Sequence, residues 1–159
     1  MTDATMILNE DGTASEASPA ALAILGVTLD QLRELPGGAF SATEPDPEAD
    51  AAFRERWERQ GSPDFGGEAT IRRLDGERVR IRFALSQLED GRYRALLIPV
   101  AGSPDAPPVI YTAGEVLAEW RSAERRLATL PAGSPEIEQV QADIAAFRAQ
   151  YQELFKRQA

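Results

Sequence analysis

The sequence predicts an α+β fold: a five-stranded antiparallel sheet with short helices on one face, followed by a C-terminal antiparallel helical hairpin. Residues 78–85 alternate arginine with apolar side chains, the period of a strand with one buried face. Residues 4–17 show a strand–turn–strand pattern, and residues 112–154 carry two runs with apolar residues every three or four positions. These elements can bury their apolar sides only by packing as layers.

The composition fits one folded domain with an appended segment. The chain has 159 residues, of which 43% are hydrophobic, so a core can form. Its net charge of −9 argues against nucleic acid and against an anionic membrane surface as partners. The chain contains no apolar run of roughly 18 residues and no basic N-terminus followed by an apolar stretch. We therefore expect a cytoplasmic protein.

The chain contains no cysteine and no histidine. This excludes disulfides, thiolate nucleophiles, zinc–thiolate sites and Ser-His-Asp catalysis. It also excludes a covalent flavin–cysteine adduct and haem ligated by histidine or cysteine. The absence of these residues leaves oxygen-only sites for magnesium or calcium open, but the sequence has no EF-hand spacing and no P-loop. We predict no metal site and no catalytic residues. Any cofactor stays unknown.

Two short helices are predicted after the N-terminal hairpin. Ser18 is placed to cap the first helix, Pro19 occupies its first position, and Gly26 stops it. Thr28 and Gln31 form a capping box for the second. Helices of one or two turns are unstable alone, so we expect both to lie against the apolar face of the sheet.

A longer helix and three strands follow. Asp46-Pro47 opens the helix, and the acids around it fit the helix dipole better than a cation site: Glu44, Asp46, Glu48 and Asp50. From residue 67 the period becomes two, and Asp75-Gly76 and Asp90-Gly91 are expected to turn hairpins between strands. The last strand, residues 93–100, is more apolar than the preceding one, with Arg94 as its charged residue.

We divide the chain into a sheet domain (1–100), a proline-rich linker (101–111) and a helical hairpin (112–159). The linker holds several prolines and a glycine, which make it stiff. Thr112 and Glu115 form a capping box for the first hairpin helix, and Ser134-Pro135 starts the second.

The order of these elements resembles a PAS domain over roughly residues 3–100. The resemblance rests on Asn9-Glu10-Asp11-Gly12 followed by Ser18-Pro19-Ala20-Ala21 and Leu25-Gly26, and on the turns Arg73-Leu74-Asp75-Gly76 and Leu88-Glu89-Asp90-Gly91-Arg92. It implies a sensor or interaction module. Ser18 stands where the family often has asparagine, and Val27 where it often has an aromatic residue. The reactive cysteine of flavin-photosensing relatives is absent.

The resemblance implies a ligand pocket between the short helices and the inner face of the sheet. The candidate lining residues are Leu22, Leu25, Leu32, Phe40, Phe53, Trp57, Phe65, Ile71, Phe83, Leu85 and Leu96. The alternative is that these side chains pack on one another as an ordinary core, since few polar groups lie among them to orient a ligand.

Arg78, Arg80 and Arg82 are predicted to face away from this pocket. They could receive an acidic partner, or form a solvated face paired with Glu68, Glu77 or Glu89. A third option is that the acidic C-terminal helices dock on them.

The hairpin exposes more apolar surface than a two-helix unit can hide. It must fold back on the sheet or form a four-helix bundle with a second copy, and we expect a homodimer. The predicted interface residues are Val116, Trp120, Leu127, Ile137, Val140, Ile144, Phe147, Tyr151 and Leu154.

These observations predict a stand-alone, non-enzymatic sensory or regulatory domain. It would bind a small molecule or a protein partner, assemble through its C-terminal helices and signal by protein–protein interaction. The alternatives are a ligand-free structural adaptor and an enzyme on a cone-like α+β fold that uses buried carboxylates.

Overall fold

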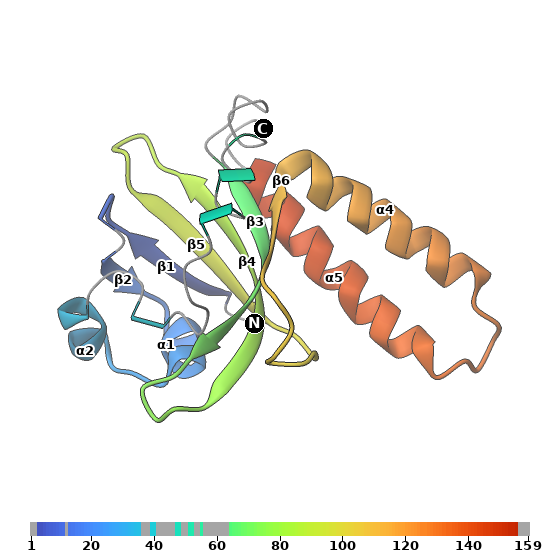
Figure 1. Cartoon of the computed structure of the whole chain (residues 1–159), viewed down its shortest axis with the longest axis horizontal. Helices are drawn as coiled ribbons and strands as arrows, with labels where there is room; N and C mark the ends of the chain where they lie inside the picture. The colour runs from blue at the N-terminus through green and yellow to red at the C-terminus, as the bar shows by residue number, and fades with distance from the viewer. Residues whose placement is uncertain are drawn as a thin grey trace.

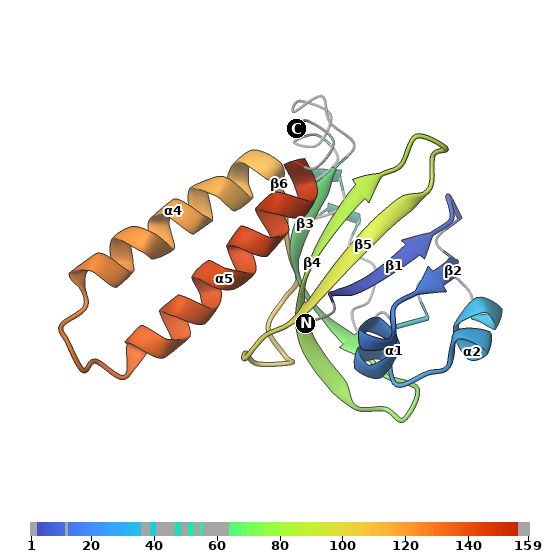
Figure 2. The same ribbon diagram turned by 180° about the vertical axis from the view of Figure 1, so that it is seen from behind.

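The computed structural model describes residues 3–11, 13–35, 39–40, 47–48, 51–52, 55 and 64–155. Within these ranges the chain forms three layers, with a sheet between two sets of helices (Figure 1). The short helices α1 (Pro19–Leu25) and α2 (Leu29–Glu34) lie on one side of the sheet. The hairpin of α4 (Ala113–Thr129) and α5 (Glu136–Phe155) lies on the other, as the reverse view confirms (Figure 2).

The sheet has six strands in the order β2-β1-β5-β4-β3-β6, and all neighbours run antiparallel. The strands are β1 (Ala4–Leu8), β2 (Ala14–Ala17), β3 (Phe65–Arg72), β4 (Arg78–Gln87), β5 (Tyr93–Pro99) and β6 (Val109–Thr112). The prediction of an α+β fold with an antiparallel sheet is confirmed. The sixth strand is a difference from the five expected.

The extra strand comes from the end of the segment predicted as a linker. β6 pairs with β3, with Thr112 opposite Phe65 and Val109 opposite Glu68. The connector before it is held by Arg80, whose guanidinium donates hydrogen bonds to the carbonyls of Ala106 (2.8 Å) and Pro107 (2.9 Å). A side chain distant in sequence therefore directs this segment to the edge of the sheet.

The predicted helix boundaries follow the capping residues. Ser18 accepts a hydrogen bond from the backbone of Ala21, and Gly26 ends α1 at a φ of +72°. Both capping boxes form, at Thr28 and at Thr112. Of the helix expected after Asp46-Pro47, the structure describes only residues 47–48, 51–52 and 55, which are helical.

Two apolar clusters lie on opposite faces of the sheet. The inner cluster joins α1 and α2 to β1, β4 and β5 through residues such as Leu25, Leu32 and Ile81. The outer cluster joins the hairpin to the sheet through Ala84 and Leu96. Neighbouring residues of β4 point to opposite faces, as the pleat requires. In the part of the chain that the structure describes, no helix is both long and apolar enough to cross a membrane.

Candidate functional site

The inner face of the sheet gathers most of the residues predicted to line a pocket. Seven belong to one apolar cluster: Leu22, Leu25, Leu32, Phe40, Ile71, Phe83 and Leu85. The ring of Phe65 meets that of Phe83 edge-on, with centroids 6.4 Å apart. Phe53 and Trp57 lie outside the described residues. The face is thus apolar, and its side chains pack on one another.

The assignment of Leu96 to this inner face is wrong. Leu96 lies opposite Ala84 on β4, and both belong to the cluster under the hairpin. Its neighbours Ala95 and Leu97 belong to the inner cluster instead. Because the pleat alternates, Leu96 cannot share their face.

Arg73, which the sequence reasoning did not single out, fastens α1 over this face. Its Nη1 donates to the carbonyls of Ala23 (3.3 Å) and Ile24 (3.5 Å) near the C-terminal end of α1. Gly26 has a φ of +72°, which favours glycine, and a Cβ there would lie 2.7 Å from Arg73 Nη2, so a larger residue would also have to displace the Arg73 guanidinium. The turn between β3 and β4 is thereby tied to α1.

The outer face of the sheet is covered by the hairpin, chiefly by α5 over β4 (Figures 1 and 2). Val116, Phe147 and Leu154 are 0%, 6% and 1% exposed and pack against the sheet, with Trp120 and Tyr151 beside them. Their side chains are therefore covered within one chain. This is the fold-back arrangement that the sequence left open.

The remaining predicted interface residues lie where the two helices face each other or near the loop. Val140 and Ile144 are buried, at 3% and 7% exposure, and Leu127 and Ile137 are partly exposed.

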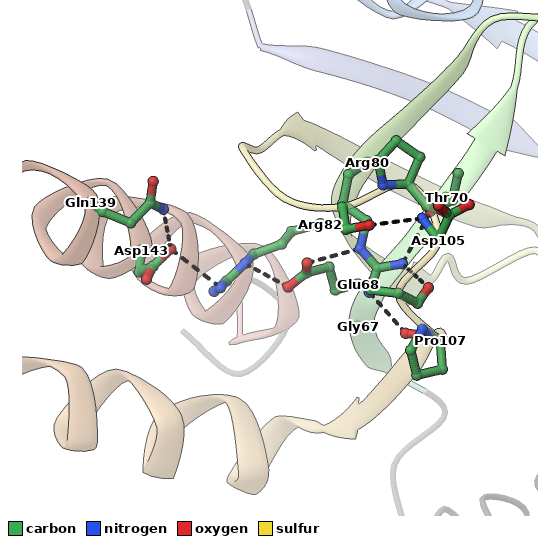
Figure 3. A network of polar contacts seen from close by, with 12 residues as sticks. Gly67, Glu68, Thr70, Arg80, Arg82, Asp105, Pro107, Gln139 and Asp143 are labelled. Atoms are coloured by element: carbon green, nitrogen blue, oxygen red, sulfur yellow. Dashed lines mark hydrogen bonds and ion pairs between the residues drawn. The ribbon is translucent and has the colours of Figure 1, made fainter. Parts of the chain in front are cut away.

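Arg82 lies in the interface between β4 and α5 (Figure 3). Its guanidinium lies 3.5 Å from the Asp143 carboxylate of α5, 3.4 Å from Glu68, and 3.8 Å from the centre of the Phe147 ring. The expectation of a solvated face is wrong here, since Arg82 is 8% exposed, but the predicted pairing with Glu68 is present. The third option, docking of an acidic residue of the C-terminal helices, is found at Arg82.

Arg80 and Arg78 have different partners. Arg80 is 4% exposed and donates from Nε to Glu68 (2.9 Å) and from Nη1 to Thr70 (3.1 Å), in addition to its bonds to the connector (Figure 3). Arg78 pairs with Asp105 at 2.7 Å. The predicted partner Glu77 lies 3.9 Å from Arg73.

Gln150 forms a second polar contact between α5 and the sheet. Its Nε2 donates to the backbone carbonyls of Gly67 on β3 and Phe83 on β4, both at 2.8 Å. Gln150 is fully buried, and its Oε1 has no hydrogen-bond partner within the described ranges. A Cβ on Gly66 would lie 2.8 Å from the Phe83 oxygen and 3.5 Å from Gln150 Nε2, so glycine permits this close approach.

Glu153 forms a third contact. It is 3% exposed, and its carboxylate lies 2.8 Å from Nε of Arg94 on β5. Sequence reasoning missed Asp143, Gln150 and Glu153 because it followed only the apolar positions of α5. The signal was present: Asp143, Phe147, Gln150 and Leu154 follow one another at spacings of four, three and four, which places them on one helical face.

Tyr111 of β6 lies at the edge of the outer cluster. Burial raises the pKa of its phenol above the ordinary value of 10.0, and the Glu119 carboxylate raises that pKa further. Among the described residues, no group of acidic side chains is placed to hold a metal ion.

Comparison with solved structures places this arrangement in a known fold. The LOV protein of Rhodobacter sphaeroides is similar, with a TM-score of 0.53 and 14% identity over 99% of this chain and 90% of that chain. A Light-Oxygen-Voltage domain studied with a flavin analogue gives 0.52 and 18% over 79% and 89%, respectively. The light-state LOV structure of the blue-light photoreceptor Aureochrome1 gives 0.50 and 21% over 62% and 82%.

No protein-family description and no curated protein matches the chain. The structural likeness nevertheless defines the class: the chain has the PAS/LOV fold, as the order of its elements predicts. In the Rhodobacter sphaeroides protein the likeness extends over nearly the whole chain, hairpin included.

Proposed function

We propose that the protein is a non-enzymatic, cytoplasmic sensory or regulatory domain of the PAS type. Its inner face receives a small apolar molecule or a partner, and its docked hairpin carries the response. The observation that supports this is the double role of β4, whose successive residues serve both faces of the sheet.

The coupling runs through residues 82–84. The side chain of Phe83 belongs to the inner cluster, while its carbonyl accepts the hydrogen bond of Gln150 from α5. On either side of it, Arg82 lies beside Asp143, and Ala84 packs under the hairpin. A ligand that displaces Phe83 must therefore shift groups that hold α5. Ligand binding would change the populations of docked and released hairpin.

The ligand would be apolar and held without a covalent bond. The inner cluster consists of aliphatic and aromatic side chains, which match apolar ligand surface. The chain has no cysteine or histidine for covalent flavin attachment or haem ligation. The hairpin would bind a second copy of the chain, and a signalling protein would be a further binding partner.

Hydrogen exchange of the α5 backbone tests the coupling directly. Phe83→Leu alters the inner face at the residue whose carbonyl Gln150 holds, so we expect faster exchange across residues 143–154. Met6→Leu, which changes the same inner cluster on β1 away from α5, is the matched control. Equal exchange in the two variants would refute the coupling.

Native and denaturing mass spectra of the purified protein test the ligand. Extra mass in the native spectrum that is lost on denaturation would support a carried small molecule. Its absence, with no change of α5 exchange on adding apolar compounds, would favour the ligand-free adaptor. That second candidate is supported by the close packing of the inner face, where Ala21, Leu25 and Leu32 are 0–2% exposed.

The carboxylate-based enzyme has less support. Such an enzyme needs a carboxyl group whose pKa is raised by burial. The carboxyl pKa shifts resolved among the described residues, those of Asp11 and Asp90, are both downward, because each accepts hydrogen bonds from nearby groups.

A further inference from the structure

A groove of about 420 Å³ runs between α4 and α5 on the side of the hairpin open to solvent. Leu127 and Ile144 form its apolar base, and Ala128 and Ala145 leave space beside them. Glu124 of α4 and Arg148 of α5 also line it. Its lining residues on α4 lie in the C-terminal half of that helix, toward the loop that joins α4 to α5.

This groove remains after the hairpin has docked. The largest apolar side chains of the hairpin, Phe147 and Leu154 among them, are covered by the sheet. A partner that binds the hairpin while α5 is docked must therefore use a different surface from the apolar row facing the sheet. The groove provides apolar surface and charge together.

The two charges stand at the same level of the hairpin. In an antiparallel pair of helices, facing residues have numbers with a nearly constant sum. Trp120 packs against Tyr151, with ring centroids 5.6 Å apart, and Leu127 and Ile144 share the groove. The same register places Glu124 beside Arg148, one on each helix.

We infer that this groove is the seam of a homodimer in which α4 of one chain lies over α5 of the other. The inference rests on the homodimer of the proposed function and names its surface. A twofold axis along the groove places Glu124 over the partner's Arg148, and the same contact repeats on the other side. A second copy thus supplies matching charges in both places, and the alanines let the helices approach closely.

Charge reversal tests the seam. Glu124→Arg or Arg148→Glu alone turns both cross-chain pairs from attraction to repulsion, so each should weaken dimerisation by about tenfold or more. Both side chains are exposed. Each reversal also places like charges at the same level within one chain, and Arg148→Glu additionally loses the contact from Arg148 to the Trp120 ring at 5.9 Å. Sedimentation velocity over a concentration series measures the dissociation constant, and circular dichroism checks the fold.

Mixing the two variants gives the sharpest result. In a mixed dimer, arginine at position 124 faces glutamate at position 148, and the partner's Arg148 faces the unchanged Glu124, so affinity should return. The matched controls are Glu138→Arg and Arg125→Glu, which reverse exposed charges of the same helices outside the groove and should leave dimerisation unchanged.

The outcomes separate the surface from the function. If the wild-type protein dimerises and neither charge reversal changes the dissociation constant, the groove is not the dimer interface, although the protein is still a homodimer. If the wild-type protein is a monomer at every concentration, both the groove interface and the proposed homodimer are wrong. Weakened variants whose mixture does not recover overturn the arrangement of α4 over α5. The coupling measured by hydrogen exchange in Phe83→Leu is independent of all three.

Discussion

The two faces of the sheet are covered by helices through different chemistry. The inner face meets α1 and α2 through a continuous apolar cluster. The outer face meets α5 through a smaller apolar cluster and three polar contacts, at Asp143, Gln150 and Glu153. Water can replace a hydrogen bond or an ion pair, but it offers no substitute for apolar contact. Helix α5 is therefore better suited than α1 and α2 to detach from the sheet and dock again.

The largest expected effect comes from removing the main apolar contact of α5. Phe147→Ala should make docking of the hairpin less favourable by about 3–5 kcal/mol. The change deletes a buried ring and removes the aromatic face on which Arg82 stacks. Urea unfolding followed by Trp120 fluorescence, in a Trp57→Phe background, measures this loss.

Leu32→Ala is the counterpart on the inner face. Leu32 is 2% exposed, so the change should cost about 2–5 kcal/mol of global stability. We expect it to lower the transition of the whole domain, whereas Phe147→Ala should separate an early hairpin transition from a later one. One shared transition in both variants would contradict the difference between the faces.

A smaller effect is expected at the buried amide. Gln150→Leu keeps the volume but removes both hydrogen bonds to the backbone of β3 and β4, and should weaken docking by about 1–3 kcal/mol. Gln152→Leu, on the exposed side of the same helix, is the control. If both variants unfold alike, the amide does not hold α5.

The smallest effect is a pH dependence at Tyr111. Burial raises the pKa of its phenol in the folded state, so the unfolded chain releases this proton first as the pH rises. The free energy of unfolding should therefore fall from about pH 10 upward, through the folded-state pKa. Tyr111→Phe should make this decline less steep, as denaturation between about pH 9 and pH 11 would measure. An unchanged slope would contradict the role of Tyr111.

Much of the fold follows from signals between near neighbours in sequence. Ser18, Thr28 and Thr112 cap helices through their own backbone and side-chain hydrogen bonds, within three residues. Gly76 and Gly91 turn hairpins at a φ of +90°. Such signals are local, so they can be read without knowledge of the rest of the chain.

The candidate site was harder to predict in β5, where successive residues that point to opposite faces of the sheet are all apolar. Ala95, Leu96 and Leu97 are all apolar, so these three residues alone do not show which face is outer. Arg94, two residues before Leu96 and paired with Glu153 of α5, is the one polar marker of the outer face in this strand. Pairing of Leu96 with Ala84 decides that it faces α5. On β4 the arginines marked the outer face correctly, but their burial depended on segments far away in the chain: the connector before β6 covers Arg80, and α5 covers Arg82.

Sequence patterns are enough to predict the first five strands, the capping residues of α1, α2 and α4, and the alternation of β4, because these depend on backbone preferences and on side chains a few residues apart. Only the tertiary structure decided that β6 joins the sheet beside β3 and that α5 lies over Arg82. Those choices rest on contacts between residues far apart in the chain: Arg80 with Pro107, and Gln150 with Gly67 and Phe83. Their strength depends on burial, which exists only once the layers have packed.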